Sequence, residues 1–285
     1  MKSSKKLRGI STIHFAKLTS IFLNKSWEID DGDNEYSSFN RFCTALSNLS
    51  DQEQALVLEL TEKFTKIDAN NYPDYLSQVL TEFINFNQKE LKKIQKIYIA
   101  PLISPKDFGK SKSSTAVQYF IRGIVSTNPG IASKRIIFTN GLEVSESLIN
   151  KDDAILLLVD DFVGSGATAL EAIEYLNRTK NIDKSKISIL TIAALEIGET
   201  NLKLNLIPVY YAMKFNRGIS DCYCSQELLE RVSLMESIET KLHVHEREKF
   251  GFDGSEALIK LIRTPNNTFP VFWKEKKGRI APFPR

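Results

Sequence analysis

The chain has 285 residues, of which 42% are hydrophobic and 26% are charged, as in ordinary globular proteins that bury their own core. The formal net charge is only +3, which excludes a global electrostatic attraction to nucleic acid. No apolar run has the length of a membrane span, and the basic start, residues 1–8, lacks the apolar stretch of a secretory signal. Cys43, Cys222 and Cys224 are an odd number of cysteines, so we expect free thiols and a cytoplasmic location.

The first third of the chain, residues 10–95, is predicted to be helical. Apolar residues recur at helical spacing in three places, and Ser50 and Glu53 form a capping box before the second of them. Pro73 marks the start of the third helix. These helices predict an N-terminal extension over residues 1–93.

From residue 94 onward, short apolar strands alternate with helices. The strands are predicted at residues 97–100, 135–139, 154–159, 187–193 and 206–213. This alternation is typical of an α/β fold with a doubly wound, mainly parallel sheet. We therefore expect an α/β domain over residues 94–285, preceded by the helical extension.

The last part of the chain begins with a predicted helix at residues 226–242 and then becomes irregular. Glycine, proline and asparagine punctuate a tail whose aromatic residues include Phe269, Phe272, Trp273 and Phe283. Packing in a core is the expected role of these rings, and stacking on a base is the alternative.

The most informative segment joins a buried strand, two acids and a glycine-containing turn without a gap. Six apolar residues, 154–159, predict a central strand that is covered on both faces, and Asp160 and Asp161 follow it. In open α/β sheets, ligands bind beyond the carboxyl ends of the strands. The turn, residues 164–168, then opens a helix, and a helix N-terminus with glycines and hydroxyls can hold a phosphate.

This segment resembles the phosphoribosyl-diphosphate signature of the type I phosphoribosyltransferases. The resemblance implies that Asp160 and Asp161 hydrogen-bond the ribose hydroxyls and take the catalytic role. It also implies that the 5-phosphate is bound by the turn residues Gly164, Ser165, Gly166, Ala167 and Thr168. Carboxylates near the anomeric carbon suit the chemistry, because displacement there passes through an oxocarbenium-like species. A Walker A loop is excluded, since no Lys-Ser/Thr pair follows the glycines.

A second loop, residues 101–114, follows the first strand of the predicted sheet, where the resemblance places a diphosphate-binding loop. It is longer and richer in lysine than is usual in that family. Lys112, Ser113 and Ser114 are the predicted diphosphate ligands, because they lie where the next helix begins. Mg²⁺ is the expected cofactor, held largely by the diphosphate and water rather than by dedicated protein ligands.

Other motifs favour plain structural roles. His243 and His245 lack a clear third ligand, so a surface pair is expected rather than a metal site. The acidic segment 30–34 lacks the spacing of a calcium loop. Basic clusters at residues 2–8 and 274–279 are expected to be solvated ends, although either is able to contact a phosphate backbone.

The segments on either side of the predicted α/β core indicate the biological setting in which the protein is expected to act. The helical prefix together with the endings 266–273 and 282–285 resembles phosphoribosyltransferase-like proteins of bacterial conflict systems, including retron-linked ones. This resemblance implies a role in antiphage defence, beside protein partners such as a reverse transcriptase or another effector.

Three functions stay open at this point. The first is an enzyme that binds phosphoribosyl diphosphate or a nucleotide and transfers the phosphoribosyl group or acts on an N-glycosidic bond. The second is a sensor or regulatory subunit that kept the pocket without turnover, because fold does not decide function. The third is a subunit that contacts nucleic acid, whose binding would fall steeply with salt. The sequence does not identify the acceptor or base.

Overall fold

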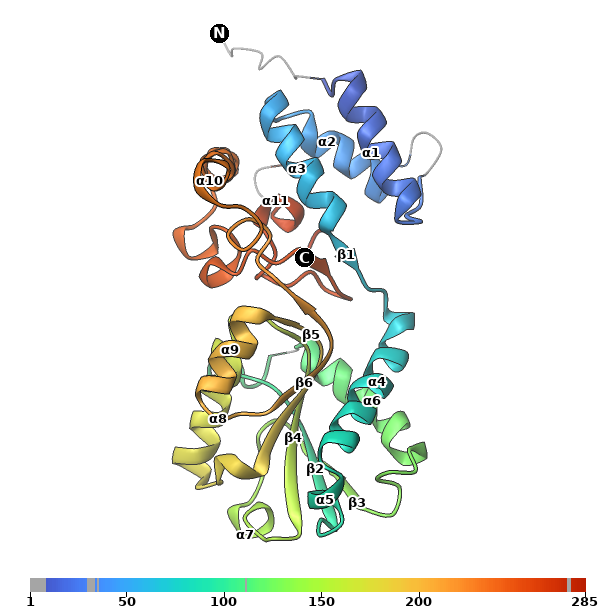
Figure 1. The fold of residues 1–285 in the computed structure, drawn as a ribbon, viewed down its shortest axis with the longest axis vertical. Helices are drawn as coiled ribbons and strands as arrows, with labels where there is room; N and C mark the ends of the chain where they lie inside the picture. Colours follow the sequence, from blue (N-terminus) through green and yellow to red (C-terminus); the bar gives the residue numbers. More distant parts are fainter. Residues whose placement is uncertain (1–8, 30–33, 35, 111, 276–277) are drawn as a thin grey trace. The chain divides into compact units, whose positions relative to one another are not determined.

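The computed structural model describes residues 9–29, 34, 36–110, 112–275 and 278–285 (Figure 1). The chain divides into two compact units. Unit 1 combines both ends of the chain, Met1–Lys66 and Arg217–Arg285, and unit 2 is the continuous segment Ile67–Asn216. From the sequence we expected the division at residues 93 and 94. The difference arises because the helix over residues 72–86 packs on the sheet, whereas the last 69 residues complete the core of the N-terminal helices.

Unit 2 is built on a five-stranded sheet in which every adjacent pair of strands is parallel. The strands are β2 (Lys96–Pro101), β3 (Arg135–Phe138), β4 (Ala154–Val163), β5 (Ile187–Leu195) and β6 (Val209–Phe215), in the order β3-β2-β4-β5-β6. Each predicted strand is present, and the predicted α/β fold with a parallel sheet is confirmed. The apolar run of β4 is its buried core, and Leu156, Leu157, Leu158 and Val159 are fully shielded from solvent.

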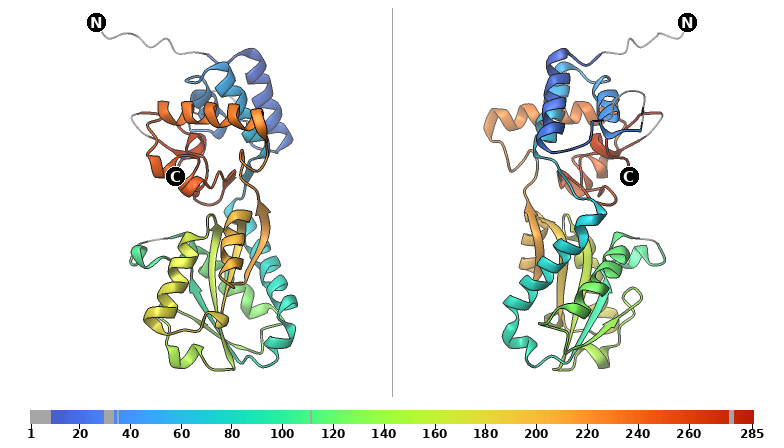
Figure 2. Two further views of the ribbon diagram at one scale, coloured as in Figure 1. Left: turned by 60° about the vertical axis from the view of Figure 1, so that its left-hand side comes forward. Right: turned by 90° about the vertical axis from the view of Figure 1, so that its right-hand side faces the viewer.

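Helices cover both faces of this sheet. They are α4 (Tyr72–Phe86), α5 (Gln88–Leu91), α6 (Ser113–Thr127), α7 (Glu146–Ile149), α8 (Ala167–Lys180) and α9 (Glu196–Leu204). Figures 1 and 2 show α4 and α6 on one face and α8 and α9 on the other. The sheet is therefore doubly wound. The chain adds β3 on one side of β2 and then adds β4, β5 and β6 on its other side, so the switch point lies between the neighbouring strands β2 and β4.

Unit 1 contains α1 (Thr12–Asn24), α2 (Ser38–Leu46), α3 (Asp51–Lys63), α10 (Ser225–Lys241), α11 (Pro270–Trp273) and the short parallel pair β1 (Thr65–Lys66) and β7 (Ile259–Lys260). The capping box of Ser50 and Glu53 begins α3 as predicted.

The aromatic tail fills the core of unit 1. Phe269, Phe272 and Phe283 are at most 1% exposed, and the Phe283 ring lies 5.0 Å from that of Phe64, between ring centroids. Trp273 is also buried, and its indole N–H donates to the Thr268 carbonyl. The predicted packing role of these rings is therefore confirmed, and burial leaves them no open face for a base.

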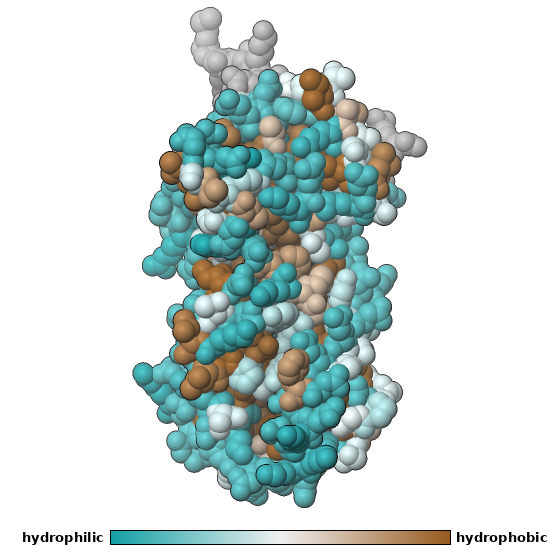
Figure 3. Space-filling view, in the orientation of Figure 1, coloured by the Kyte–Doolittle hydropathy of each residue, from teal (hydrophilic) through white to brown (hydrophobic). Residues whose placement is uncertain are grey.

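Hydrophilic side chains dominate the face of the molecule in Figure 3, where apolar side chains form small separate groups. None of the helices in the described part of the chain combines the length and apolar character that a bilayer-spanning helix needs.

The remaining motifs have no assigned role in the site. The expectation that the cluster 274–279 is solvated is wrong for two of its residues, because Lys274 pairs with Glu248 and Arg279 donates to the carbonyls of Val271 and Lys274. Cys43, Cys222 and Cys224 are free thiols, and His243 and His245 are exposed. Across the described residues, no three His, Cys, Asp or Glu side chains converge to hold a metal ion. The acidic segment 30–34, apart from Asn34, and the basic start 1–8 lie outside the described residues, as do two positions of the cluster 274–279.

Candidate functional site

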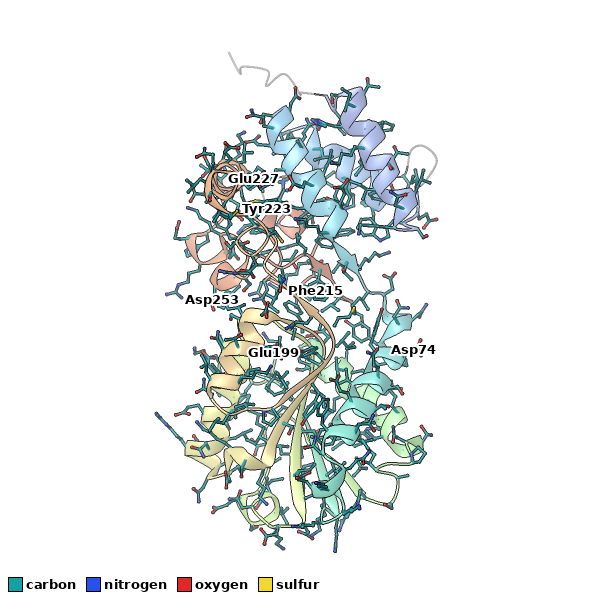
Figure 4. All side chains as sticks on the ribbon, in the orientation of Figure 1. Asp74, Glu199, Phe215, Tyr223, Glu227 and Asp253 are labelled. Atoms are coloured by element: carbon teal, nitrogen blue, oxygen red, sulfur yellow. The ribbon has the colours of Figure 1, made fainter. Side chains whose placement is uncertain are left out.

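The candidate site lies at the carboxyl edge of the unit 2 sheet, where the winding direction changes. β2 and its neighbour β4 run side by side as far as Pro101 and Val159. Beyond that point β2 ends, and β4 continues for four more residues, paired only with β5. In doubly wound sheets, ligands bind in the crevice beyond the strands at this switch point. Figure 4 marks the surroundings of this edge with Glu199 in α9, Phe215 at the end of β6 and Asp74 in α4.

The acid pair occupies this overhang of β4. Asp160, the first residue past the end of β2, pairs with Thr191 of β5. Its side chain keeps partial exposure, whereas Asp161 is only 3% exposed. The two residues therefore differ in exposure, Asp160 being intermediate and Asp161 buried.

Each carboxylate accepts a hydrogen bond from the hydroxyl of a residue that begins a helix. The Ser113 hydroxyl, at the start of α6, donates to Asp160 Oδ1 over 3.0 Å, and the backbone N–H of Asp161 donates to the same oxygen over 2.9 Å. The Tyr72 hydroxyl, at the start of α4, donates to Asp161 Oδ2 over 2.9 Å. The pair is thus held by its own backbone and by two helix starts that are far apart in the sequence.

Burial makes the negative charges of this pair costly. Burial, followed by the neighbouring charge of Asp161, raises the pKa of Asp160 well above its usual range. The pKa of Asp161 is also raised by burial, against which the hydrogen bonds from Ser113 and Tyr72 act. A ligand that donates hydroxyl hydrogen bonds to the pair would relieve this cost.

The predicted phosphate turn lies directly after the overhang of β4. Gly166 caps α8 in the left-handed conformation, with a φ of 84°, which glycine adopts without strain. No side chain caps this helix through Gly166, and the Ala167 N–H makes only a long bond of 3.4 Å to the Ser165 hydroxyl. The helix N-terminus is accordingly rich in backbone donors, and Thr168 is exposed beside it.

Helix α9 fixes the shape of this turn. A Cβ atom added at Gly198 would lie far closer to the Gly164 carbonyl oxygen than van der Waals contact allows, and one added at Gly166 would lie 3.2 Å from the Gly198 carbonyl oxygen. The Asn201 side chain donates to the Ser165 carbonyl over 2.9 Å. The turn and the helix therefore touch backbone to backbone, which only glycines permit.

The second predicted loop leaves β2 at the other side of the switch point. A short 3₁₀ turn, Pro105–Asp107, lies within it, and Lys112 forms the N-cap of α6 without a capping side chain. Its cations are already paired with acids of unit 2. Asp107 binds both Lys110 and Lys112 at 2.7 Å, and Glu171 of α8 binds Lys106 at 2.5 Å.

Two of the three predicted diphosphate residues, Ser113 and Ser114, do not offer their side-chain hydroxyls to a ligand. The Ser113 hydroxyl donates to Asp160, so its backbone N–H is the donor available to an anion. The hydroxyl of Ser114 is fully buried and has no hydrogen-bond partner. The structure thus brings Lys112, Ser113, the acid pair and the glycine turn to one edge of the sheet.

Three residues of this site were missed by the sequence analysis: Tyr72, Gly198 and Asn201. Gly198 lies just after the predicted strand at residues 187–193, and an isolated glycine in such a place is a weak signal of close packing. Tyr72 and Asn201 carried none, since their roles depend on contacts with distant segments.

A doubly wound sheet with an acid pair and a glycine turn at its switch point resembles the phosphoribosyltransferases. The chain belongs to the PRTase-CE family, whose sequence model matches residues 40–285. This match begins within α2 and extends to the last residue, so it includes most of unit 1 as well as the sheet. No curated protein matches the sequence.

Solved structures are similar to this chain over parts of its length. Orotate phosphoribosyltransferase from Aeropyrum pernix is 12% identical over 59% of this chain and 74% of its own, with a TM-score of 0.28. APRTase from Giardia lamblia, complexed with 9-deazaadenine, is 14% identical over 49% and 79%, with a TM-score of 0.30. A hypothetical protein from Neisseria gonorrhoeae with bound ppGpp is 13% identical over 61% and 97%, with a TM-score of 0.33.

Proposed function

We propose that the chain binds phosphoribosyl diphosphate or a nucleotide together with Mg²⁺ and acts on an N-glycosidic bond. The observation that carries this proposal is that the acid pair, the glycine turn and the lysine-bearing loop meet at one switch point. Each of the three has a matching part in the ligand, namely the ribose hydroxyls, the 5-phosphate and the diphosphate.

Asp160 is the carboxylate best placed to accept hydrogen bonds from the ribose hydroxyls, because it is the more exposed of the two. Asp161 would strengthen the negative potential behind it. As the bond at the anomeric carbon breaks, positive charge develops on the sugar, and a desolvated pair of carboxylates stabilises that charge.

The diphosphate would lie between Lys112 and the N-terminus of α6. Lys110 and Lys112 would give up their ion pairs with Asp107 and bind the diphosphate instead. The backbone N–H of Ser113 would donate a hydrogen bond to the diphosphate. Mg²⁺ suits this donor set, since it is usually bound through substrate phosphates and water rather than by a protein cage. When bound, it would offset charge on the leaving diphosphate.

A sensor or regulatory subunit without turnover is the second candidate. The observation that favours it is the neutralised loop, in which Asp107 and Glu171 occupy the lysines that an enzyme needs for its leaving group. Such a protein would bind the same ligands and release no diphosphate.

The proposed setting is antiphage defence, as in retron-linked systems, beside a reverse transcriptase or another effector. Support for it comes from the resemblance of the flanking segments to proteins of bacterial conflict systems, not from the geometry of the site. Direct contact with nucleic acid through the basic ends is a weaker proposal, which predicts binding that falls steeply with salt.

One assay separates the enzyme from the sensor. The wild-type chain is incubated with phosphoribosyl diphosphate, Mg²⁺ and a mixture of bases and nucleotides, and diphosphate release and ligand binding are followed. Asp160→Asn and Asp161→Asn test the site, and Asp183→Asn, which removes an acid that caps a distant 3₁₀ turn, is the matched control.

An enzyme releases diphosphate in the wild type and the control but not in the two site variants. Binding without release identifies the sensor. Equal release by all four proteins would refute the assignment of the site, and absence of both binding and release would refute the function itself.

A further inference from the structure

Tyr72 is the residue of this site that neither the glycine turn nor the acid motif identifies. It begins α4, outside the predicted α/β domain, and its hydroxyl donates to Asp161 Oδ2 over 2.9 Å. We infer that Tyr72 is a positioning residue, which fixes the Asp161 carboxylate as an acceptor behind Asp160 and thereby prepares the pair for a sugar hydroxyl. The part of this inference that concerns the ligand rests on the proposed function.

Packing fixes the hydroxyl in place. Tyr72 is fully buried, and its ring lies 5.6 Å from that of Phe120 in α6, between ring centroids. Its backbone closes the preceding 3₁₀ turn through a bond to the Ala69 carbonyl, and Pro73 follows it directly. A ring with two torsions, locked on both sides, presents its hydroxyl in one direction only.

The electrostatics of Asp161 give this hydroxyl its importance. Burial raises the pKa of Asp161. Hydrogen bonds with the hydroxyls of Ser113 and Tyr72, with the Asp160 side chain and with its own backbone lower this pKa. No cation is among these described groups. A hydrogen bond donated to a carboxylate favours the ionised form. The Tyr72 hydroxyl therefore opposes the effect of burial and favours the ionised form of Asp161, whose pKa is still raised.

The α4 helix that carries Tyr72 lies on the same face of the sheet as α6, which carries Ser113 (Figures 1 and 2). Asp74, labelled in Figure 4, marks the same first turn of α4. Each acid thus depends on one hydroxyl from the beginning of a neighbouring helix, and the two helices pack on each other.

The test is Tyr72→Phe, which removes the hydroxyl and keeps the buried ring. The matched control is Tyr210→Phe, which removes a hydroxyl bonded to Asn87 at another place in unit 2. The Asp161 carboxyl is titrated by carbon NMR in the full chain without ligand, with Asp161→Asn identifying its signal. We expect Tyr72→Phe to raise the pKa of Asp161 and the control to leave it unchanged.

Binding of phosphoribosyl diphosphate with Mg²⁺ is then measured by calorimetry across pH. Tyr72→Phe should weaken binding about tenfold near neutral pH, as for the loss of a hydrogen bond to a charged group, and the loss should grow as the pH falls. In an Asp161→Asn background, the same substitution should have little further effect.

The two measurements separate the inference from the proposed function. An Asp161 titration that is identical in Tyr72→Phe and wild type overturns the positioning role. A shifted titration in a protein whose wild type binds no ligand supports the positioning role and refutes the sugar-phosphate function. Unchanged affinity in Tyr72→Phe, with a shifted titration, overturns the part of Tyr72 in ligand recognition.

Discussion

The two loops at the switch point of unit 2 are held in place by different kinds of contact. The turn after β4 rests on α9 through backbone contacts at Gly164, Gly166 and Gly198, supported by one side-chain hydrogen bond. The loop after β2 is held by exposed ion pairs and by the hydroxyl of Ser104, which donates to Glu171.

This difference agrees with the separate tasks that the proposed function gives the two loops. Backbone contacts between glycines allow no alternative arrangement, so the β4 turn is preformed for a group of fixed size such as a monophosphate. Exposed ion pairs contribute little stability and exchange readily. The β2 loop is therefore suited to a group that arrives and leaves, as a diphosphate does.

The largest expected effect is that of Gly198→Ala, which would disturb the rigid turn after β4. The new methyl group would overlap the Gly164 carbonyl, so the turn or α9 must move. We expect a loss of about 3 kcal/mol in the free energy of unfolding and a loss of phosphate binding. Thermal unfolding and calorimetry measure the two.

Gly123→Ala is the matched control for this change. Gly123 lies in α6, and a Cβ atom added there has no neighbour within 4 Å. Helix propensity alone predicts stabilisation by about 0.5–1 kcal/mol. If both alanine variants are stabilised, the close contact between α9 and the turn does not constrain the site.

Asp160→Asn acts where the two loops meet. Asp160 is the first residue of β4 beyond the end of β2, and its carboxylate accepts a hydrogen bond from the Ser113 hydroxyl. Because its pKa is raised, the folded chain holds this proton more tightly than the unfolded chain. The associated stability is present at low pH and is lost as pH rises through the raised pKa. The variant should therefore be more stable than wild type at pH 8, by on the order of 1–3 kcal/mol, and equal at pH 3.

The same variant should lose ligand affinity while it gains stability at pH 8. Unfolding curves at several pH values and one binding isotherm check both signs. Lower stability of Asp160→Asn at pH 8 would mean that the carboxylate is stabilised by contacts other than those described.

Asn201→Ala removes the side-chain support of the β4 turn and leaves the glycine contacts intact. The lost bond to the Ser165 carbonyl predicts destabilisation by about 1 kcal/mol and phosphate binding that is weakened several-fold. Asn205→Ala, which removes a bond within α9 itself, is the control. Equal loss of phosphate affinity in both variants would contradict a specific role of Asn201.

Asp107→Asn has the smallest expected effect and tests the exchangeable loop. Asp107 holds Lys110 and Lys112, and these two lysines keep its pKa below the usual range. Its removal should raise diphosphate affinity about two- to fivefold, since exposed ion pairs contribute about 0.2–1 kcal/mol, and the gain should shrink in high salt. Weaker binding would show that Asp107 shapes the loop rather than occupying its cations.

The strand and turn of the site were predictable because their signals are local. Six apolar residues followed by Asp160 predict a central strand, and β4 has that core. The parallel, doubly wound character of the sheet followed from the alternation of strands and helices, whereas the spatial order of its strands was not predicted. The extra four residues of β4 were not foreseen, since acids and a glycine after a strand are typical of its end.

The parts that sequence did not predict depend on packing partners. Helix α4 has an amphipathic pattern like that of α2, and such a pattern does not show which core the helix joins. Its contacts with β5 and β6 place it in unit 2, and this placement brings Tyr72 to Asp161. The burial of Phe283 against Phe64 likewise joins segments that no local period connects.

The assembly of unit 1 from both chain ends sets the order of events during synthesis. Thr65 of β1 pairs with Ile259 of β7, and the whole of unit 2 lies between them. Helices α1 to α3 leave the ribosome before unit 2, whereas the rings that complete their core leave after it. Unit 2 is continuous and forms while those helices still lack partners, so a stalled or truncated chain would display an unfinished aromatic surface, the kind that chaperones bind and that aggregates.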